Sequence, residues 1–215
     1  MVETYFWSQE NGTLHGQRGR LDPWRLAWAA GPVPAGADPV TPREALKRLA
    51  ASHALRRVPV GIIGPKEATA AQLATAEVLG GLIAGHGLQL LCGGKNGVME
   101  AACKGCLEAG GLPVGLIPDE EWHFANPYVA IPLATGIGPA RNALIARACQ
   151  VLIAVGGGYG TLSEMAYGLH FNRPVLALCD APPVDGATVC ADAEEVMDRV
   201  CALVLERAGD DAGLS

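Results

Sequence analysis

From Val58 onward, short apolar runs alternate with segments of helical periodicity, and this alternation restricts the fold more than any other feature. It is typical of a parallel sheet buried by helices on both faces. Strands are expected at about 58–63, 88–92, 113–117, 128–131, 151–155 and 174–178, with helices at about 69–85, 97–109, 139–149, 161–171 and 191–207. The sequence therefore predicts a Rossmann-like, doubly wound, mostly parallel α/β domain. Right-handed crossovers bring all its strand-to-helix turns to one edge of the sheet.

The first 57 residues have a different character, with three of the four tryptophans and a proline-rich stretch at 31–42. The segment 5–15, which turns at Asn11-Gly12, predicts a short β-hairpin. Thr41-Pro42-Arg43-Glu44 predicts a helix that begins with a capping box and runs to about residue 54. We therefore expect an N-terminal extension of hairpin, linker and helix at 1–57, a nucleotide-binding domain at 58–208 and a frayed tail at 209–215.

Composition limits the classes of partner. The chain has 215 residues, half of them apolar, which is enough for one well-buried domain. A net charge of -6 argues against duplex nucleic acid and anionic membranes, because both are bound by clustered basic side chains. Neither a leader pattern nor an apolar run of spanning length is seen, so a cytoplasmic protein is expected. High apolar content with few charges favours self-association into a homo-oligomer.

Cysteines and histidines indicate no metal site. Seven cysteines, an odd number, fit reduced thiols better than a disulfide framework. Cys103-x-x-Cys106 has a metal-like or redox-like spacing, but without a second pair it favours two neighbours on one helix face. His86 and His170, near helix ends, are expected to be caps or surface groups. The sequence thus predicts neither a metal bound by side chains nor another cofactor.

Two glycine-rich turns, at 91–97 and 154–161, each end an apolar strand and open a helix. Glycines let the backbone approach a ligand, and the exposed N–H groups at a helix start favour an anion. Glycines also simply make tight turns, but two such turns on one sheet edge favour a phosphate site. The predicted phosphate-binding or nucleotide-binding residues of the turns are Gly93, Gly94, Gly97, Gly157, Gly158, Tyr159, Gly160 and Thr161.

Two charged side chains are candidates for chemistry beside these turns. Arg141 falls in the first turn of its helix, where a cation opposes the helix dipole unless it faces a phosphate or carboxylate. The alternative is an arginine that extends along the surface. Glu164 lies one turn from the second glycine run and can meet a ribose or base, although Thr161-x-x-Glu164 also reads as a capping box. Glu100, in the first turn after the other glycine run, is a weaker candidate with a similar alternative.

The segment 157–164, Gly-Gly-Tyr-Gly-Thr-Leu-Ser-Glu, resembles the PGGxGTxxE motif of the Lonely Guy family. These cytokinin-activating phosphoribohydrolases were once mislabelled as lysine decarboxylases. Arg141 stands where that family carries its catalytic arginine, and Arg147 matches a further family arginine. Over roughly 58–178 the chain is more similar to a sister group of bacterial Rossmann-like nucleotide-binding proteins, which also resembles molybdenum cofactor carrier proteins. That similarity rests on CGGKNGVMEAA, ANPYV, TGIGPARNA and AVGGGYGTLSE.

The resemblance implies a nucleoside 5'-monophosphate ligand, with Arg141 and Glu164 as catalytic residues in hydrolysis of the N-glycosidic bond. It also implies a nucleotide-binding role for Asn126, in the segment 119–126 that follows a strand and has the position of a lid. Gly156, Asn142 and Glu100 depart from the enzymes' usual proline, lysine and glycine, so the scaffold and binding site transfer better than the activity. The alternative is a carrier or sensor of a nucleotide-like ligand such as molybdenum cofactor. Lysine decarboxylase activity is not expected, because none of the four lysines has a recognisable pyridoxal phosphate context.

Overall fold

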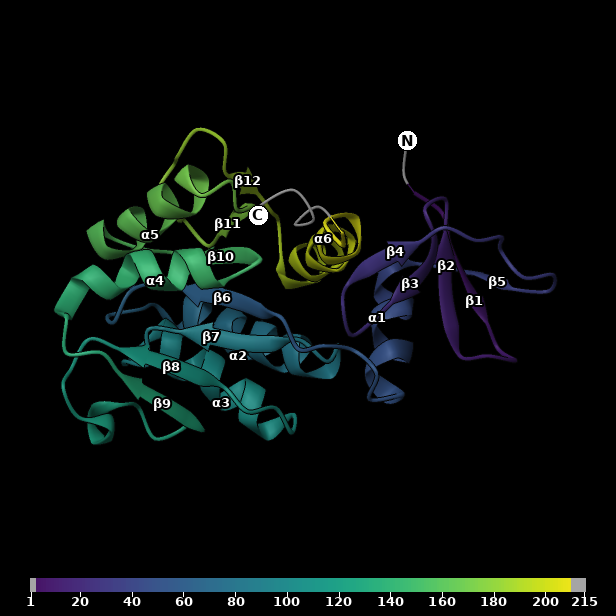
Figure 1. The fold of residues 1–215 in the computed structure, drawn as a ribbon. Coiled ribbons are helices and arrows are strands. Elements are labelled where there is room, and N and C mark those ends of the chain that lie inside the picture. The colour runs from purple at the N-terminus through teal and green to yellow at the C-terminus, as the bar shows by residue number, and fades with distance from the viewer. Residues whose placement is uncertain (1–2, 210–215) are drawn as a thin grey trace. The chain divides into compact units, whose positions relative to one another are not determined.

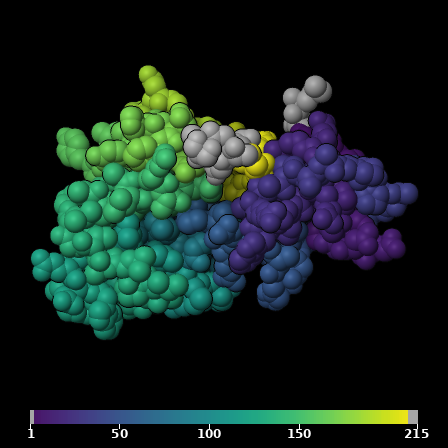
Figure 2. All heavy atoms as spheres, viewed as in Figure 1, coloured from purple at the N-terminus to yellow at the C-terminus, as the bar shows by residue number. Residues whose placement is uncertain are grey.

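The computed structural model describes residues 3–209, which form two compact units (Figure 1). One unit contains residues 58–197, and the other combines the N-terminal segment up to residue 57 with residues from 198 onward. Each unit is a closely packed body of atoms (Figure 2). Among the described residues, no helix combines the length and the apolar content that crossing a membrane requires. Most of the predicted tail, from residue 210, lies outside the described residues.

The larger unit is built on a seven-stranded sheet in the order β12-β11-β10-β6-β7-β8-β9. Every strand pair in it is parallel, which confirms the predicted Rossmann-like architecture. The strands are β6 (Pro59–Ile63), β7 (Gln89–Cys92), β8 (Val114–Ile117), β9 (Ile131–Ala134), β10 (Val151–Val155), β11 (Val175–Leu178) and β12 (Thr188–Val189). β10 is buried along its whole length, as its uninterrupted apolar sequence predicts.

Two pairs of helices cover this sheet. α2 packs on α3 and α4 packs on α5, and Figure 1 shows the pairs on opposite faces. The helices are α2 (Ala70–Gly85), α3 (Val98–Glu108), α4 (Arg141–Ala148), α5 (Tyr159–His170) and α6 (Ala193–Glu206), and the 3-10 turns are η1 (Trp122–Phe124) and η2 (Gly138–Ala140). The core joins the sheet to α4 and α5 through residues such as Ile63, Ile145, Leu152 and Met165.

The strand expected at about 128–131 begins later, at Ile131. The side chain of Asn126 accepts a hydrogen bond from the N–H of Tyr128, and the Asn126 carbonyl accepts one from Val129. These bonds hold residues 126–129 in a turn, which is a typical use of an asparagine side chain. The apolar pattern alone does not reveal the turn.

The smaller unit contains an antiparallel sheet in the order β4-β3-β2-β1-β5, followed by α1 (Pro42–Ala51). Its strands are β1 (Tyr5–Ser8), β2 (Thr13–Gly16), β3 (Gly19–Asp22), β4 (Ala27–Ala29) and β5 (Asp38–Val40). The predicted hairpin is confirmed by the pairing of Trp7 with Leu14. The predicted capping box of Thr41 and Glu44 is also confirmed. The expected linker was wrong at 38–40, because these residues form the strand β5, which pairs with β1. Pro39 is tolerated there because β5 lies at the edge of the sheet.

The end of α6 is fastened to this antiparallel sheet. The Arg18 guanidinium donates to the carbonyl oxygens of Leu205, Glu206 and Ala208, and it also pairs with Glu3. The indole N–H of Trp28 donates to Leu205 as well. Arg18 thereby donates to carbonyl groups at the end of the helix, where few backbone N–H partners are left. The second half of α6 is therefore held by side chains of the N-terminal segment, and the division between the units falls within this helix.

Candidate functional site

The strand order places a topological switch point between β6 and β10. From β6 the chain builds the sheet outward through β7, β8 and β9, whereas from β10 it builds through β11 and β12. Ligands of open α/β sheets bind at such a point, beyond the carboxyl ends of the strands. A cavity of about 370 Å³ lies there. Its lining residues are Gly64, Pro65, Lys66, Met99, Pro118, Pro139, Arg141, Asn142, Gly158, Gly160, Thr161 and Glu164.

In the second glycine run, two residues shape the turn and two leave space. Gly156 and Gly157 have φ values of 61° and 149°, which side chains rarely tolerate. A Cβ on Gly157 would also lie 2.6 Å from the Cβ of Thr161. In contrast, a Cβ on Gly158 or Gly160 would meet no atom within 4 Å, and both residues line the cavity. These two positions therefore keep the backbone open to a ligand.

Helix α5 begins at this turn without a side-chain cap. Gly158 is its N-cap, and no side chain hydrogen-bonds to the first-turn amides. The helix starts two residues earlier than predicted, so Thr161 is its third residue and Glu164 its sixth. The capping-box interpretation of Thr161 and Glu164 was therefore wrong. Uncapped N–H groups and the helix dipole make this end of the cavity favourable for an anion.

Glu164 is buried at the cavity, with 6% of its surface exposed. Burial raises the pKa of its carboxyl group to about 7, and the charge of Arg141 opposes that shift. Desolvation disfavours the charged carboxylate, which explains the direction. Glu164 therefore exchanges a proton near neutral pH, as a general acid or base must.

Arg141 is buried as well, so its interpretation as a surface arginine was wrong. Its Nη1 lies 3.4 Å from Oε1 of Glu164, and its Nη2 donates to the carbonyl oxygen of Gly93 at 3.3 Å. A Cβ on Gly93 would collide with the guanidinium, so glycine is required there to admit the arginine. Burial lowers the pKa of Arg141, with Glu164 opposing the shift. The first glycine run thus contacts the buried ion pair through the Gly93 carbonyl.

Asn142 connects this ion pair to the second glycine turn. Its Oδ1 accepts a hydrogen bond from Nη1 of Arg141. Its Nδ2 donates to Oγ of Ser163 at 3.0 Å and to the Gly160 carbonyl at 3.4 Å. Both ends of the amide are therefore engaged within the protein. Asn142, one of three residues that depart from the Lonely Guy pattern, therefore has a defined structural role here.

The first glycine turn is packed rather than open. Substituted Gly94 would collide with Ile117, and substituted Gly97 with the carbonyl oxygens of Pro65 and Lys66. The N–H of Gly94 already donates to Sγ of Cys92. Gly93, Gly94 and Gly97 are absent from the cavity lining. The two turns were expected to form one phosphate site together, but the first turn instead supports Arg141.

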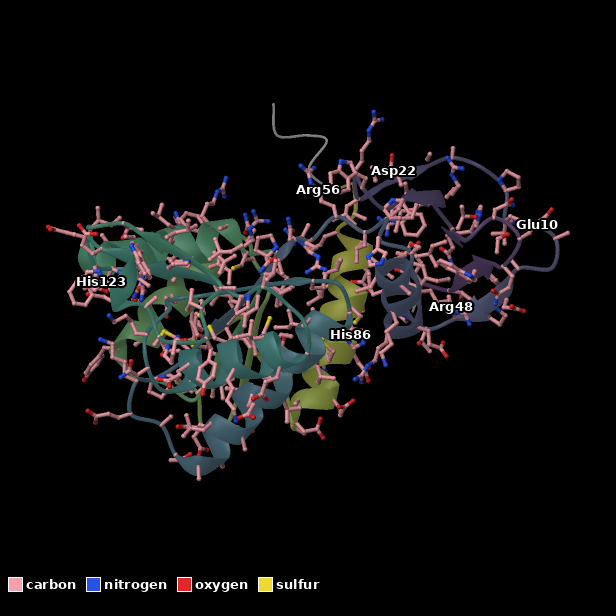
Figure 3. The ribbon with its side chains drawn as sticks, turned by 90° about the horizontal axis from the view of Figure 1, so that it is seen from below. Glu10, Asp22, Arg48, Arg56, His86 and His123 are labelled. Atoms are coloured by element: carbon pink, nitrogen blue, oxygen red, sulfur yellow. The ribbon has the colours of Figure 1, made fainter. Side chains whose placement is uncertain are left out.

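Asn126 secures the first glycine turn. Its N–H donates to the Gly94 carbonyl at 2.9 Å, and its Nδ2 donates to the Lys95 carbonyl at 3.0 Å. Lys95 in turn pairs with Asp119 at 2.9 Å and donates to the Phe124 carbonyl at 2.8 Å. The segment 119–126, expected as a lid, is therefore fastened to the turn. Figure 3 shows His123 of this segment at the outer edge of the larger unit.

Replacing Asn126 with alanine is expected to destabilise the protein by about 1–3 kcal/mol, because the half-buried Lys95 carbonyl and Tyr128 N–H lose the side-chain amide that pairs with them. The affinity of the cavity for inorganic phosphate should fall less than about threefold, because Asn126 does not line the cavity. Denaturant unfolding and calorimetric titration measure the two effects. A large loss of affinity without a loss of stability would contradict the supporting role.

The remaining residues selected from the sequence do not line the cavity. Tyr159 is 93% exposed and Glu100 lines a neighbouring groove rather than the cavity. His86 is the buried C-cap of α2 and contacts the Leu82 carbonyl. Cys103 and Cys106 are buried free thiols on α3, and Cys103 lies 3.4 Å from Cys92.

Sequence reasoning missed the turn after β6. Gly64, Pro65 and Lys66 line the cavity, and Lys66 is the exposed cation beside it. A Gly-Pro pair directly follows the first predicted strand of the domain, and it is the sequence signal for this turn. A strand-to-helix turn at that place lies on the edge of the sheet where ligands bind. It lacks a glycine run, which is the pattern that marked the other two turns.

Comparison with known proteins shows the family of the chain. The model of the SLOG cluster4 family matches residues 57–203. The chain belongs to the SLOG cluster4 family. This member resembles the molybdenum cofactor binding protein of Rippkaea orientalis, with 34% identity, a TM-score of 0.66 and coverage of 69% of this chain and 98% of the other.

This SLOG cluster4 protein is also similar to a carrier protein and to an enzyme. The molybdenum cofactor carrier protein of Chlamydomonas reinhardtii has 36% identity and a TM-score of 0.64, with 69% of this chain and 99% of the carrier covered. The cytokinin riboside 5'-monophosphate phosphoribohydrolase of Rhodococcoides fascians is 33% identical over 123 residues. That match covers 49% of this chain and spans 58% of the enzyme's length.

Proposed function

We propose that the chain binds a nucleoside 5'-monophosphate and hydrolyses its N-glycosidic bond. The observation that carries the proposal is the buried Arg141–Glu164 pair, which lies in the same cavity as the uncapped start of α5. An uncapped helix start supplies N–H donors for a phosphate, and a carboxyl group with a pKa of about 7 supplies proton transfer. The sequence relationship to a phosphoribohydrolase supports the same chemistry.

The order of the strands indicates which end of the cavity would hold the phosphate and which would hold the base. The phosphate would lie at Gly158, Gly160 and Thr161, beyond β10, with Lys66 beside it as a cation. The ribose would lie at Arg141 and Glu164, because Arg141 reaches from α4 to the end of β7. The base would then extend toward Pro118, which follows β8.

In the proposed reaction, a water oxygen forms a bond to C1' of the ribose while the C1'–N bond to the base breaks. The electron pair of that bond passes to the base nitrogen, which is protonated on release. Ionised Glu164 accepts the water proton and its charge favours the oxocarbenium-like transition state. Arg141 positions this carboxylate from 3.4 Å and balances its charge. The products are the free base and ribose 5-phosphate.

The direct test is incubation of the purified protein with AMP, GMP, IMP, CMP and UMP. Free base is measured by liquid chromatography and ribose 5-phosphate by a coupled enzymatic assay. We expect both products in equal amounts from at least one nucleotide. Binding of these nucleotides without release of base would reject the hydrolase and leave the nucleotide-binding function in place.

A second candidate is a carrier of molybdenum cofactor. It is favoured by the coverage of the two molybdenum cofactor proteins, each matched over nearly its whole length. Molybdenum cofactor also carries a phosphate, so the same helix start would serve it. Protein purified from cells that make the cofactor would then contain molybdenum and pterin in equal proportion. AMP would neither displace them nor be hydrolysed.

Self-association is proposed as well. The described residues of the larger unit leave several large apolar side chains exposed, among them Ile131, Leu133, Ile137 and Leu144. Exposed apolar patches of this kind are typical of protein–protein contacts. Light scattering on the purified protein measures the number of subunits.

A further inference from the structure

Two cysteine thiols meet beneath the first glycine turn. Cys92 is the last residue of β7, and Cys103 lies on α3, which packs on β7. Their Sγ atoms are 3.4 Å apart, and both residues are fully buried. The spacing Cys103-x-x-Cys106 indicated neighbours on one helix face, whereas this contact joins the helix to the sheet. A disulfide bond is about 2.05 Å long, so the two sulfur atoms are little more than an ångström from bonding distance.

The two thiols have different surroundings. The backbone N–H of Gly94 donates to Sγ of Cys92 at 3.3 Å, and the Cys103 S–H is placed to donate to the same sulfur. The hydrogen bond from Cys103 is the largest influence and lowers the pKa of the Cys92 thiol against the effect of burial, and the Gly94 N–H and the charge of Arg141 lower it further. The contact with Cys92, together with burial, raises the pKa of Cys103. Cys92 is therefore the thiol that ionises, and a thiolate is the reactive form of cysteine.

Other buried cysteines show the ordinary effect of burial. Desolvation raises the thiol pKa of Cys149 and of Cys201, as expected for a thiol in apolar surroundings. Burial would give Cys92 the same shift if no hydrogen-bond donor faced its sulfur. The arrangement around Cys92 thus distinguishes it from thiols that simply fill the core.

The pair lies directly behind the candidate site. Sγ of Cys92 is 4.0 Å from the carbonyl oxygen of Met99, a residue that lines the cavity. The residue after Cys92 is Gly93, whose carbonyl accepts the hydrogen bond from Arg141. One layer of residues therefore separates the Cys92 sulfur from a small oxidant in the cavity. A bond between the two sulfur atoms would close a loop, 92–103, that contains the whole first glycine turn.

We propose that Cys92 and Cys103 are a reversible oxidation site, at which hydrogen peroxide forms a disulfide between them. The Cys92 thiolate attacks one peroxide oxygen and the O–O bond breaks, so the other oxygen takes up a proton and leaves as water, and Cys92 becomes a sulfenic acid. The Cys103 sulfur loses its proton and attacks the Cys92 sulfur, the S–O bond breaks, and a second water leaves. Two thiols thus give up two electrons and two protons, and one peroxide becomes two water molecules. Dithiothreitol reverses the change by thiol–disulfide exchange.

The test is peroxide treatment of the reduced, folded full chain, followed by alkylation of free thiols in denaturant and mass spectrometry of tryptic peptides without reduction. Trypsin gives the peptides 67–95 and 96–104, which carry Cys92 and Cys103 as their single cysteines. We expect these two peptides to be linked, with the loss of two hydrogen atoms, and to separate on reduction with dithiothreitol. The link should form at least about tenfold faster than oxidation of Cys149, whose thiol stays protonated.

Two variants sharpen the test. Cys103→Ser should stop the reaction at a sulfenic acid on Cys92, which dimedone traps. Cys179→Ser is the matched control, because Cys179 is a half-buried thiol that contacts the Thr75 hydroxyl, and it should form the link at the wild-type rate. The wild-type peptide map stands even if the first variant does not fold. Free Cys92 and Cys103 after a treatment that oxidises Cys179, a link that forms only in denaturant, or a link from Cys103 to Cys106 would overturn the proposal.

Discussion

Replacing Glu164 with glutamine is expected to slow base release from AMP by about 10²–10⁴-fold, the usual contribution of a positioned acid or base. Glutamine keeps the shape of the side chain and an oxygen for Arg141, but it cannot accept a proton. AMP affinity should change little, because the phosphate is held at the start of α5. Glu108→Gln is the control, since Glu108 ends α3 at an exposed position. Equal loss in both variants would remove Glu164 from the reaction.

The same carboxyl group predicts a pH dependence. Glu164 acts in its ionised form, and burial places its pKa at about 7. The wild-type rate at low AMP concentration should therefore rise about tenfold per pH unit below 7 and level off above it. Residual activity of Glu164→Gln should lack this step. A rate that falls as the pH rises through 7 would assign Glu164 the opposite role, that of an acid.

Replacing Arg141 with methionine is expected to lower the free energy of unfolding by about 3–5 kcal/mol at pH 8.5, because it leaves a buried carboxylate without its partner. The loss should be smaller at pH 5.5, where Glu164 is protonated. In the wild type a carboxyl pKa raised above the unfolded value already means that stability is lost as the pH rises through about 7. Without the guanidinium this effect should increase.

Denaturant unfolding at pH 5.5 and 8.5 measures the prediction for Arg141. Arg147→Met is the matched control on the same helix, because Arg147 is exposed and contacts the Phe171 ring. Its loss should stay below about 1 kcal/mol at both pH values. The double variant Arg141→Met with Glu164→Gln should recover most of the stability lost at pH 8.5. An equal loss at both pH values in Arg141→Met would contradict a titrating partner.

Much of the larger unit could be predicted because its signals are local and periodic. Apolar runs such as 151–155 are buried on both faces, and only a parallel sheet between helices provides that environment. The errors arose where a single side chain, or its absence at a glycine, determines the local backbone conformation. Asn126 delays β9, and the open N-cap at Gly158 lets α5 start earlier than Thr161 suggests. In the smaller unit, β3 and β4 are too short to show a pattern.

The candidate site could be predicted only in part, because the sequence does not show which groups meet in the folded protein. Glycine runs mark turns, but they do not say whether the absent side chain admits a ligand or a neighbouring residue. Gly158 faces open space, whereas Gly93 makes room for Arg141. Arg141 and Glu164 were each selected by position in a helix, and their contact across α4 and α5 is a tertiary feature. Lys66 was missed because its turn lacks repeated glycines.

The most direct measurement is a crystal structure of Glu164→Gln with AMP. We predict that the phosphate oxygens accept hydrogen bonds from the backbone N–H groups of the first turn of α5, at Tyr159, Gly160 and Thr161, with the adenine against Pro118 and Pro139. A phosphate bound instead at the first glycine turn, or at the groove lined by Glu100 and Lys104, would contradict the account.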